Sequence, residues 1–182
     1  MKPTFFFFLL ISSISFSQNL NNLDLKNGFK QFKLGSSPDQ IKNTVRNESK
    51  ENRLFNNNPN IKCYDYNGNY NETIFNVEIE SISLIFFKNK LVSISVSFGR
   101  VGNDFDKEKY DFVLYSLEVA YGKKWEFGKS NAKDFVEGAV WAGKNVTLEL
   151  SRNNYSNKYD FTGGYIYVFD NKLNQEIAKS QL

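Results

Sequence analysis

The sequence predicts an α+β domain: antiparallel sheet, two main helices packed on one side, and a short C-terminal helix. The first observation is the alternation of apolar and polar residues in two long segments, residues 61–98 and 136–169, which is typical of strands. The second is helical spacing of apolar residues in residues 36–47 and 104–122, one ahead of each segment. Runs of strands separated by helices favour an antiparallel sheet covered by helices.

The first helix is expected within and after the stretch FKLGSSPDQIKN, residues 32–43. Gly35 ends a short extended segment, and Ile41 and Val45 then lie one helical turn apart. A glycine followed by serines could also cradle a phosphate, but a P-loop needs a second glycine followed directly by lysine, which this stretch lacks. The pattern therefore favours a helix start, in which the capping and first-turn residues are Ser36 or Ser37, Pro38 and Asp39.

The next segment, residues 48–60, is expected to be a loop because it is rich in asparagine and contains a proline. Strands follow it. The pair Asn67 and Gly68 is a strong signal for a hairpin between strands. Further along, residues 88–90 predict a turn that leads into an alternating strand over residues 91–98.

The most regular helical pattern covers residues 104–122. Apolar side chains recur there at helical spacing, Asp104 can cap the start, and Gly122 suits the C-terminal end. Further strands and a last helix are expected beyond it: strands at residues 136–141, 146–150 and 165–169, and a short helix after Asp170.

The N-terminal residues have the pattern of an export signal. Lys2 precedes an apolar run over residues 5–14, and small residues follow. The run is too short for a membrane-spanning helix, which needs ~20 residues. We therefore expect a signal peptide over residues 1–17, cleaved between Ser17 and Gln18, and an exported protein, secreted or periplasmic, that does not span the membrane once the signal is removed.

Behind the signal we expect a flexible lead-in over residues 18–28 and a single α+β domain over residues 29–182. One domain is the default because the mature chain has about the length of one. The similar phrases FFKNKL and VFDNKL raise an alternative, a weak repeat. Its two halves would be residues 29–102 and 103–182.

The composition argues against several classes of function. The formal net charge is +3 and the charges are interspersed, whereas nucleic-acid-binding domains show a concentrated basic face, so we expect no nucleic-acid partner. The chain has no histidine and one cysteine, so it lacks the residues for Ser-His-Asp and Cys-His catalysis and for histidine or multi-cysteine zinc sites. We expect no catalytic residue, no metal and no cofactor. Cys63 is expected to be buried in a strand.

The stretch FKLGSSPDQI, followed by a polar gap and an aromatic-rich strand ending in KNKL, resembles the opening of BamE/SmpA-like and β-lactamase-inhibitory-protein-like domains. These are small exported α+β modules in which a helix is followed by three or four antiparallel strands. The resemblance covers residues 29–98. The chain departs from it at Ser36 and Ser37, where Met-Thr is usual, and in lacking the paired cysteines of the inhibitory protein. The resemblance implies a fold and the binding of other proteins, and it implies no active site.

Three other groups of residues were weighed as candidate sites. Residues 65–72, DYNGNYNE, offer oxygen ligands for calcium, but their order is not that of an EF-hand, and a hairpin tip is favoured. Glu78 and Glu80 can share one strand face and could serve glycoside hydrolysis, although a solvated strand face gives the same spacing. A glycan could stack on aromatic rings, although packing is the commoner role of such residues: Trp125, Trp141, Tyr64, Tyr66 and Tyr70.

The binding residues that we expect lie on the strand over residues 91–98. Ser93, Ser95 and Ser97 alternate with apolar residues, so they share one face if Val92, Ile94, Val96 and Phe98 point at the helices. A face of small hydroxyls is flat and can accept the side chains of a partner. We therefore expect a non-enzymatic exported domain that binds a protein or a component of the cell envelope. The alternative is a carboxylate-dependent glycan hydrolase or a glycan-binding module.

Overall fold

The computed structural model describes residues 18–68, 73–74, 76–155 and 160–181. The expected signal peptide lies outside the described residues, and so does the Ser17 side of the expected cleavage site. The helices are α1 (Gln18–Lys26), the short 3-10 helix η1 (Pro38–Gln40), α2 (Glu48–Phe55), α3 (Lys107–Tyr121) and α4 (Asn171–Ser180). None of the helices in this described part of the chain combines the length and the apolar character needed to cross a membrane.

The strands are short at both edges of the fold and long in its middle. Their bounds are β1 (Gly28–Phe29), β2 (Phe32–Lys33), β3 (Thr44–Arg46), β4 (Ile61–Tyr66), β5 (Thr73–Ile74), β6 (Val77–Glu78), β7 (Ser81–Phe87), β8 (Lys90–Phe98), β9 (Glu126–Phe127), β10 (Phe135–Ala142), β11 (Val146–Asn154) and β12 (Thr162–Asp170).

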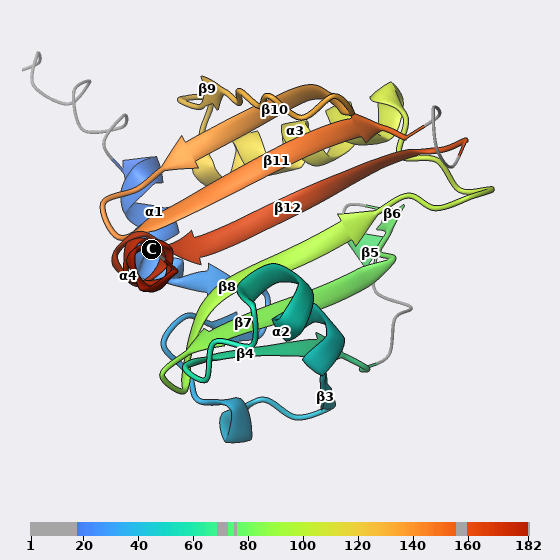
Figure 1. Cartoon of the computed structure of the whole chain (residues 1–182). Coiled ribbons are helices and arrows are strands. Elements are labelled where there is room, and N and C mark those ends of the chain that lie inside the picture. The colour runs from blue at the N-terminus through green and yellow to red at the C-terminus, as the bar shows by residue number, and fades with distance from the viewer. Residues whose placement is uncertain (1–17, 69–72, 75, 156–159, 182) are drawn as a thin grey trace, which may run out of the picture.

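Eight strands form one antiparallel sheet in the order β3-β4-β7-β8-β12-β11-β10-β9 (Figure 1). The predicted antiparallel α+β class and the C-terminal helix are therefore confirmed. The order is that of two meanders that meet at their last strands, because β8 and β12 pair at the centre of the sheet. The hairpins β1–β2 and β5–β6 stand outside it.

The main hydrophobic core lies between the sheet and helices α1 and α3. Leu23 of α1 and Leu117 of α3 are fully buried against Ile94, Ile166 and other apolar residues of the central strands. Burial of such side chains is the main favourable term in folding, at roughly 1.5–3 kcal/mol for each large apolar side chain. The core runs without a break from β7 to β11, across the β8–β12 pair.

The other two long helices lie on the opposite face of the sheet. Figure 1 shows α2 and α4 in front of the strands and α3 behind them. A second, smaller apolar cluster lies under α4, where Ile177 packs with Ile61, Phe87 and Val92. Helices therefore cover both faces, whereas we expected the main helices on one side.

The expected helix over residues 36–47 is wrong. Only η1 forms, and the chain leaves the helical region at Ile41, whose φ and ψ are −111° and 109°, before it enters the edge strand β3. Ser37 does sit ahead of the helical turn, and its N–H donates to the side chain of Gln40 at 2.9 Å. The helix stops because Val45 has no core to pack against: 55% of its surface is exposed.

The expected loop over residues 48–60 instead contains α2. Asn47 caps this helix by accepting a hydrogen bond from the N–H of Lys50 at 2.8 Å, and Asn56 and Asn57 end it with positive φ angles. Asn56 and Asn57, which contributed to the loop prediction, thus end a helix that Asn47 begins, and both are common roles for asparagine. Its buried residue is Glu51 rather than an apolar one.

Most of the lead-in expected over residues 18–28 is helix α1. Leu23 is fully buried. Asp24 binds the turn before β11, where its carboxylate accepts hydrogen bonds from three backbone N–H groups, those of Lys144, Asn145 and Val146, at 2.8–2.9 Å. Such contacts hold a polar segment in place although its sequence carries little apolar surface.

Two turn predictions have different outcomes. Residues 88–90 form the predicted turn, since Lys88 and Asn89 both have positive φ angles and join β7 to β8. Asn67 and Gly68 do not join a hairpin of neighbouring strands, because β4 pairs with β3 and β7 and not with β5. Part of that segment, residues 69–72, lies outside the described residues.

The expected cap of the long helix is also corrected. Asp106, not Asp104, caps α3 by accepting a hydrogen bond from the N–H of Lys109 at 2.9 Å. Asp104 instead accepts a hydrogen bond from the N–H of Thr162 at the start of β12. Gly122 ends the helix with a φ of 87°, as expected.

A β-bulge changes the expected faces of β8. The register between β7 and β8 shifts at Ile85, so that Val92 is the extra residue. Val92 consequently packs under α4 in the smaller cluster, on the face that carries the serines, while Ile94, Val96 and Phe98 point into the main core. The expectation that all four apolar residues share a face is wrong for Val92.

Candidate functional site

The face of the sheet that carries α2 and α4 has a groove of about 670 Å³. We call it the serine–tyrosine groove. Its floor comes from three neighbouring strands, β7, β8 and β12, at positions that pair directly across the sheet. One cross-strand row is Ser83, Ser95 and Tyr167, and the next is Ser81, Ser97 and Tyr165.

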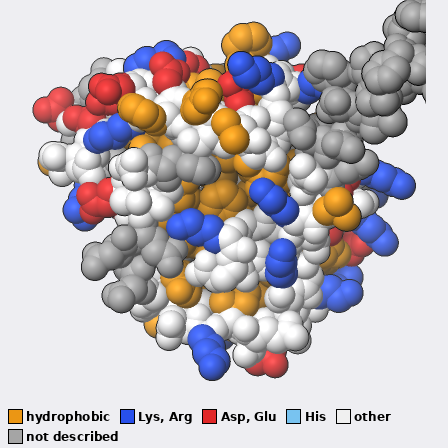
Figure 2. Space-filling view, turned by 180° about the vertical axis from the view of Figure 1, so that it is seen from behind, with side chains coloured by type: hydrophobic (Ala, Val, Ile, Leu, Met, Phe, Trp, Pro, Cys, Tyr) orange, Lys and Arg blue, Asp and Glu red, His pale blue; other side chains and the backbone are white. Residues whose placement is uncertain are grey.

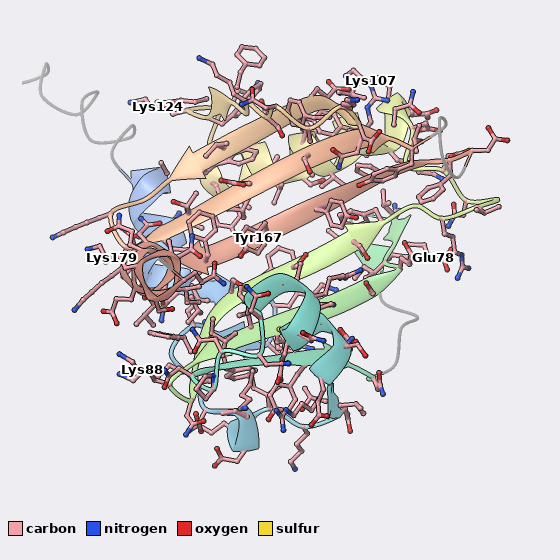
Figure 3. The ribbon with its side chains drawn as sticks, viewed as in Figure 1. Glu78, Lys88, Lys107, Lys124, Tyr167 and Lys179 are labelled. Carbon is pink, nitrogen blue, oxygen red and sulfur yellow. The ribbon has the colours of Figure 1, made fainter. Side chains whose placement is uncertain are left out.

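The hydroxyl groups of this floor are linked to one another. The Oγ atoms of Ser81 and Ser97 lie 2.6 Å apart, and the Tyr167 hydroxyl donates to Ser93 Oγ at 3.2 Å. Tyr167, labelled in Figure 3, stands on the front of the sheet beside α2. Burial raises the pKa of the Tyr167 hydroxyl, so this group stays a neutral donor.

Helix α2 forms one wall and is fixed to the sheet by a polar network. The Lys50 ammonium donates to Asp65 Oδ1 at 3.0 Å and to Ser83 Oγ at 2.6 Å, and Ser83 donates to the same carboxylate oxygen at 2.9 Å. Asn47 donates to the other oxygen of Asp65 at 2.6 Å. Burial acts to raise the pKa of Asp65, but these three donors outweigh it and the pKa is lowered.

The same network bears on catalysis. A serine beside a lysine can act as a nucleophile when the lysine amine is neutral and takes the serine proton. Here the ammonium of Lys50 pairs with Asp65, and the Ser83 proton points to Asp65. The arrangement therefore suits a lysine that holds α2 on the sheet.

Two charged side chains of the groove remain available to a ligand. Among the described residues, neither the guanidinium of Arg53 on α2 nor the carboxylate of Glu80 lies within 4.0 Å of an opposite charge. Partial burial raises the pKa of Glu80, and the charge of Arg100 offsets part of that effect. Lys50, by contrast, is already neutralised by Asp65.

Aromatic rings form the wall opposite α2. Tyr155 and Phe161 line it, with ring centroids 5.3 Å apart, and the Tyr155 hydroxyl donates to that of Tyr165 at 3.3 Å. Burial also raises the pKa of Tyr155. The groove thus combines a hydroxyl floor, one aromatic wall and one helical wall.

The three expected binding serines share the predicted face, but their surroundings differ. Ser95 and Ser97 line the groove and are half-buried. Ser93 is 1% exposed and is occupied by the hydrogen bond from Tyr167. The face that we expected to be flat is bounded by α2 and by the rings of Tyr155 and Phe161, so it forms a groove instead of an open surface.

The other candidate groups are not assembled into sites. Trp141 is fully buried and lies 6.2 Å from the Trp125 ring, while the rings of Tyr64 and Tyr66 pack on Phe86 and Phe32 elsewhere. Tyr70 and part of the expected calcium loop lie outside the described residues. Among the described residues no three His, Cys, Asp or Glu side chains cluster as a metal site would require.

The two glutamates that sequence analysis paired have separate environments. Glu78 lies at the β5–β6 hairpin (Figure 3), where it accepts from Arg100 at 3.1 Å and from Asn103 at 2.8 Å. Glu80 lines the groove. The buried Cys63, expected in a strand and found in β4, has a pKa raised to about 11 by burial, so its thiol is not activated.

Sequence analysis named Glu80 but missed Lys50, Arg53 and the aromatic members of the groove. Tyr165 and Tyr167 are two apart in a predicted strand, so the period of two already places them on one face. That signal was present. Arg53 and Lys50 gave no such signal, because residues 48–60, which contain their helix α2, were predicted to be a loop.

Comparison of the chain with protein-family models, with curated proteins and with solved structures finds no match.

Proposed function

We propose that this protein is a non-enzymatic exported domain that binds a protein or a component of the cell envelope in the serine–tyrosine groove. The observation that carries the proposal is the groove itself, a polar hollow of about 670 Å³ whose floor comes from three rigid central strands. Binding sites built on strands hold their side chains in fixed geometry.

The charges of the groove also support binding over catalysis. Arg53 and Glu80 offer one positive and one negative contact, which favours a partner that carries both signs, as proteins do. Tyrosine and arginine are the residue types that contribute most to protein interfaces. The hydroxyls of Ser81 and Ser97 are hydrogen-bonded to each other, and among the described residues neither has a hydrogen bond to a carboxylate or an amine.

The experiment is quantitative capture from the envelope fraction of the producing cell, with Ser95→Arg as the test variant. Ser95 lies in the middle of the floor, and an arginine there fills the groove. Asn131→Arg is the matched control, because it adds the same charge at an exposed position outside the groove. We expect one captured species to fall roughly tenfold or more with Ser95→Arg, since a clash costs at least ~1.4 kcal/mol.

Folding of each variant is checked first by circular dichroism and urea unfolding. Retention of the same species by Ser95→Arg and by Ser97→Arg, with both variants folded, would show that the partner binds elsewhere. Loss of the species with Asn131→Arg as well would show an effect of charge alone. The captured species, once purified, gives a dissociation constant for each variant.

A glycan is the second candidate ligand, and one observation favours it. Tyr155, Phe161 and Tyr165 bring ring faces and hydroxyls to one wall, as sugar-binding sites do. Glu80→Gln separates binding from hydrolysis. A glycan hydrolase that uses Glu80 as its acid loses turnover with this change, whereas a binding module keeps its affinity within a few-fold. Turnover of any envelope glycan by the wild-type protein would overturn the non-enzymatic proposal.

A further inference from the structure

A second cavity, of about 480 Å³, lies on the opposite face of the molecule from the serine–tyrosine groove. We call it the lysine-rimmed cleft. Its floor is apolar, because Phe29, Ile74, Leu117 and Tyr121 line it and are 0–8% exposed. It lies between the C-terminal ends of α1 and α3, the β1–β2 hairpin and β5. Its volume falls in the range typical of small-molecule sites, about 300–1,000 Å³.

The rim of this cleft is positively charged. Lys26, Lys30 and Lys33 line it, and none of its described lining residues is Asp or Glu. Figure 2, which views the molecule from behind, shows basic side chains around apolar ones in the middle of this face. Within the described part of the chain, Lys26 and Lys33 have no carboxylate within 4.0 Å.

Contacts with neighbouring groups hold two of these ammonium groups at the rim. The Lys26 ammonium lies 4.6 Å from the centroid of the Tyr121 ring, and Lys33 Nζ donates to the backbone oxygen of Lys26 at 2.7 Å. Neither contact neutralises the charge. Two ammonium groups are thus held at the mouth of an apolar cavity.

We propose that the lysine-rimmed cleft binds a free single-chain amphiphile with an anionic head, whose chain lies on the apolar floor and whose head meets Lys26 and Lys33. Because the cleft has an apolar floor and a positively charged rim, it suits a ligand that has an apolar part and an anionic part. An inorganic anion would leave the floor exposed to water, and an uncharged hydrocarbon would leave the ammonium groups unpaired. The site is separate from the serine–tyrosine groove and does not depend on its function.

The competing explanation is structural. Lysines at helix C-terminal ends stabilise the helix dipole, and Lys33 does donate to the last turn of α1. That role explains the position of one ammonium group. It does not explain the cavity beneath it, so the two explanations differ in whether an amphiphile binds at all.

The experiment is calorimetric titration of the purified protein with dodecanoate, below the concentration at which it forms micelles. Dodecyltrimethylammonium tests the sign of the head, and acetate tests the head without the chain. We expect binding of dodecanoate alone, weakened by added salt. Lys26→Gln and Lys33→Gln should each weaken it roughly two- to fivefold, the effect of one partly exposed charge, and the double variant roughly tenfold.

Two further variants separate charge from space. Ala120→Trp places a large side chain in the cleft from α3 and should weaken dodecanoate binding roughly tenfold or more, because it fills the cavity. Lys179→Gln, on α4 and labelled in Figure 3, removes the same charge from a residue that does not line the cleft and should leave binding unchanged. Urea unfolding of every variant establishes that it is folded.

Four outcomes would overturn the proposal. One is no binding of dodecanoate to the wild-type protein. Another is equal binding of the cationic amphiphile, which would show an unspecific apolar effect. The third is sedimentation with phosphatidylglycerol vesicles without binding of free dodecanoate, which would assign the lysines to a membrane surface. Loss of stability alone in Lys33→Gln, with dodecanoate binding intact, would limit the ligand contact to Lys26 and contradict the two-lysine site.

Discussion

Glu51 shows how one buried charge can fix a helix to a sheet. It is 4% exposed, and its carboxylate accepts two hydrogen bonds from Arg46, at 3.0 and 2.8 Å, and one from the N–H of Cys63 at 2.9 Å. A buried carboxylate is tolerated only when its oxygens are paired in this way. The bonds from Arg46 hold the pKa of Glu51 below its ordinary value, although burial opposes them.

The stability of the protein should therefore fall on the acid side. Because the folded state lowers the pKa of Glu51, the carboxylate stabilises the fold above its unfolded pKa of about 4.3, and this contribution disappears as the pH falls through the folded value. Asp65, whose pKa is also lowered, adds in the same direction. Urea unfolding at pH 7 and pH 3 measures the loss.

The variant Glu51→Gln tests the source of that loss. Glutamine keeps an acceptor for the N–H of Cys63 but cannot titrate, so the variant should lose less stability than the wild type between pH 7 and pH 3. Glu51→Ala leaves the N–H without an acceptor and should cost about 2 kcal/mol at pH 7. An acid loss as large in Glu51→Gln as in the wild type would assign the effect to other groups.

For single residues, the sequence predicted which face of a strand a side chain occupies better than it predicted what surrounds that side chain. Ser95 and Ser97 share a face because a strand has a period of two, and this holds whatever covers the face. What covers it was not predictable from the strand alone. Ser93 is buried because Tyr167, 74 residues away in the chain, lies beside it. Pairing between distant strands leaves no local signal in either one.

Among the elements, α1 depends most on a few polar contacts. Three N–H groups before and at the start of β11 donate to Asp24, and Gly143 is required beside it, since a Cβ there would lie 2.6 Å from Asp24 Oδ1. Asp24→Ala should thus destabilise the protein by roughly 1–3 kcal/mol, because the N–H groups lose a charged acceptor. Hydrogen exchange should then show faster exchange in α1.

The control for this prediction is Asp39→Ala, which removes a fully exposed carboxylate from the short helix η1 and should leave exchange in α1 unchanged. Protection of α1 that stays at the wild-type level in Asp24→Ala would mean that Leu23 alone holds the helix. Faster amide exchange confined to residues 143–146 would likewise mean that Leu23 alone holds the helix. Either result would contradict the role assigned to the carboxylate.

The elements that were predicted correctly are those in which the spacing of apolar residues within the element itself indicates a helix or a strand. Helix α3 and strands β8 and β12 bury regular apolar residues and were predicted within a few residues. Helices α1 and α2 were missed because polar residues hold them, Asp24 in one and Glu51 in the other. The helix expected over residues 36–47 failed because its start signals were present without an apolar face to bury.

On the scale of the whole molecule, the sheet joins the two halves that the sequence raised as a weak repeat. Strands from residues 29–102 end at β8 and strands from residues 103–182 end at β12, and these two pair through six residue positions, from Gly164–Phe98 to Phe169–Ser93. The similar phrases do not occupy matching places: one spans the β7–β8 turn and the other the start of α4. The two halves therefore resemble each other in the order of their strands and not in the positions of these phrases.

This arrangement predicts a single cooperative unfolding transition. The main core contains Ile94 and Val96 from one half and Ile166 and Val168 from the other, all fully buried, so neither half has a closed core of its own. Separating the halves would expose these residues together with the backbone of β8 and β12, a cost that opposes any state with one half folded. The ratio of calorimetric to van't Hoff enthalpy should therefore be close to one.

A fragment experiment tests the same point from the other side. Residues 18–102 expressed alone keep α1 and the first meander but lack β12 and α3, so the main core loses every residue that the second half contributes to it. We expect this fragment to give no cooperative urea transition and to expose apolar surface that binds a hydrophobic dye. Mixing it with residues 103–182 should restore a cooperative transition, because β8 and β12 can then pair. A cooperative transition in the isolated first fragment would show that the molecule consists of two independent domains that share a sheet.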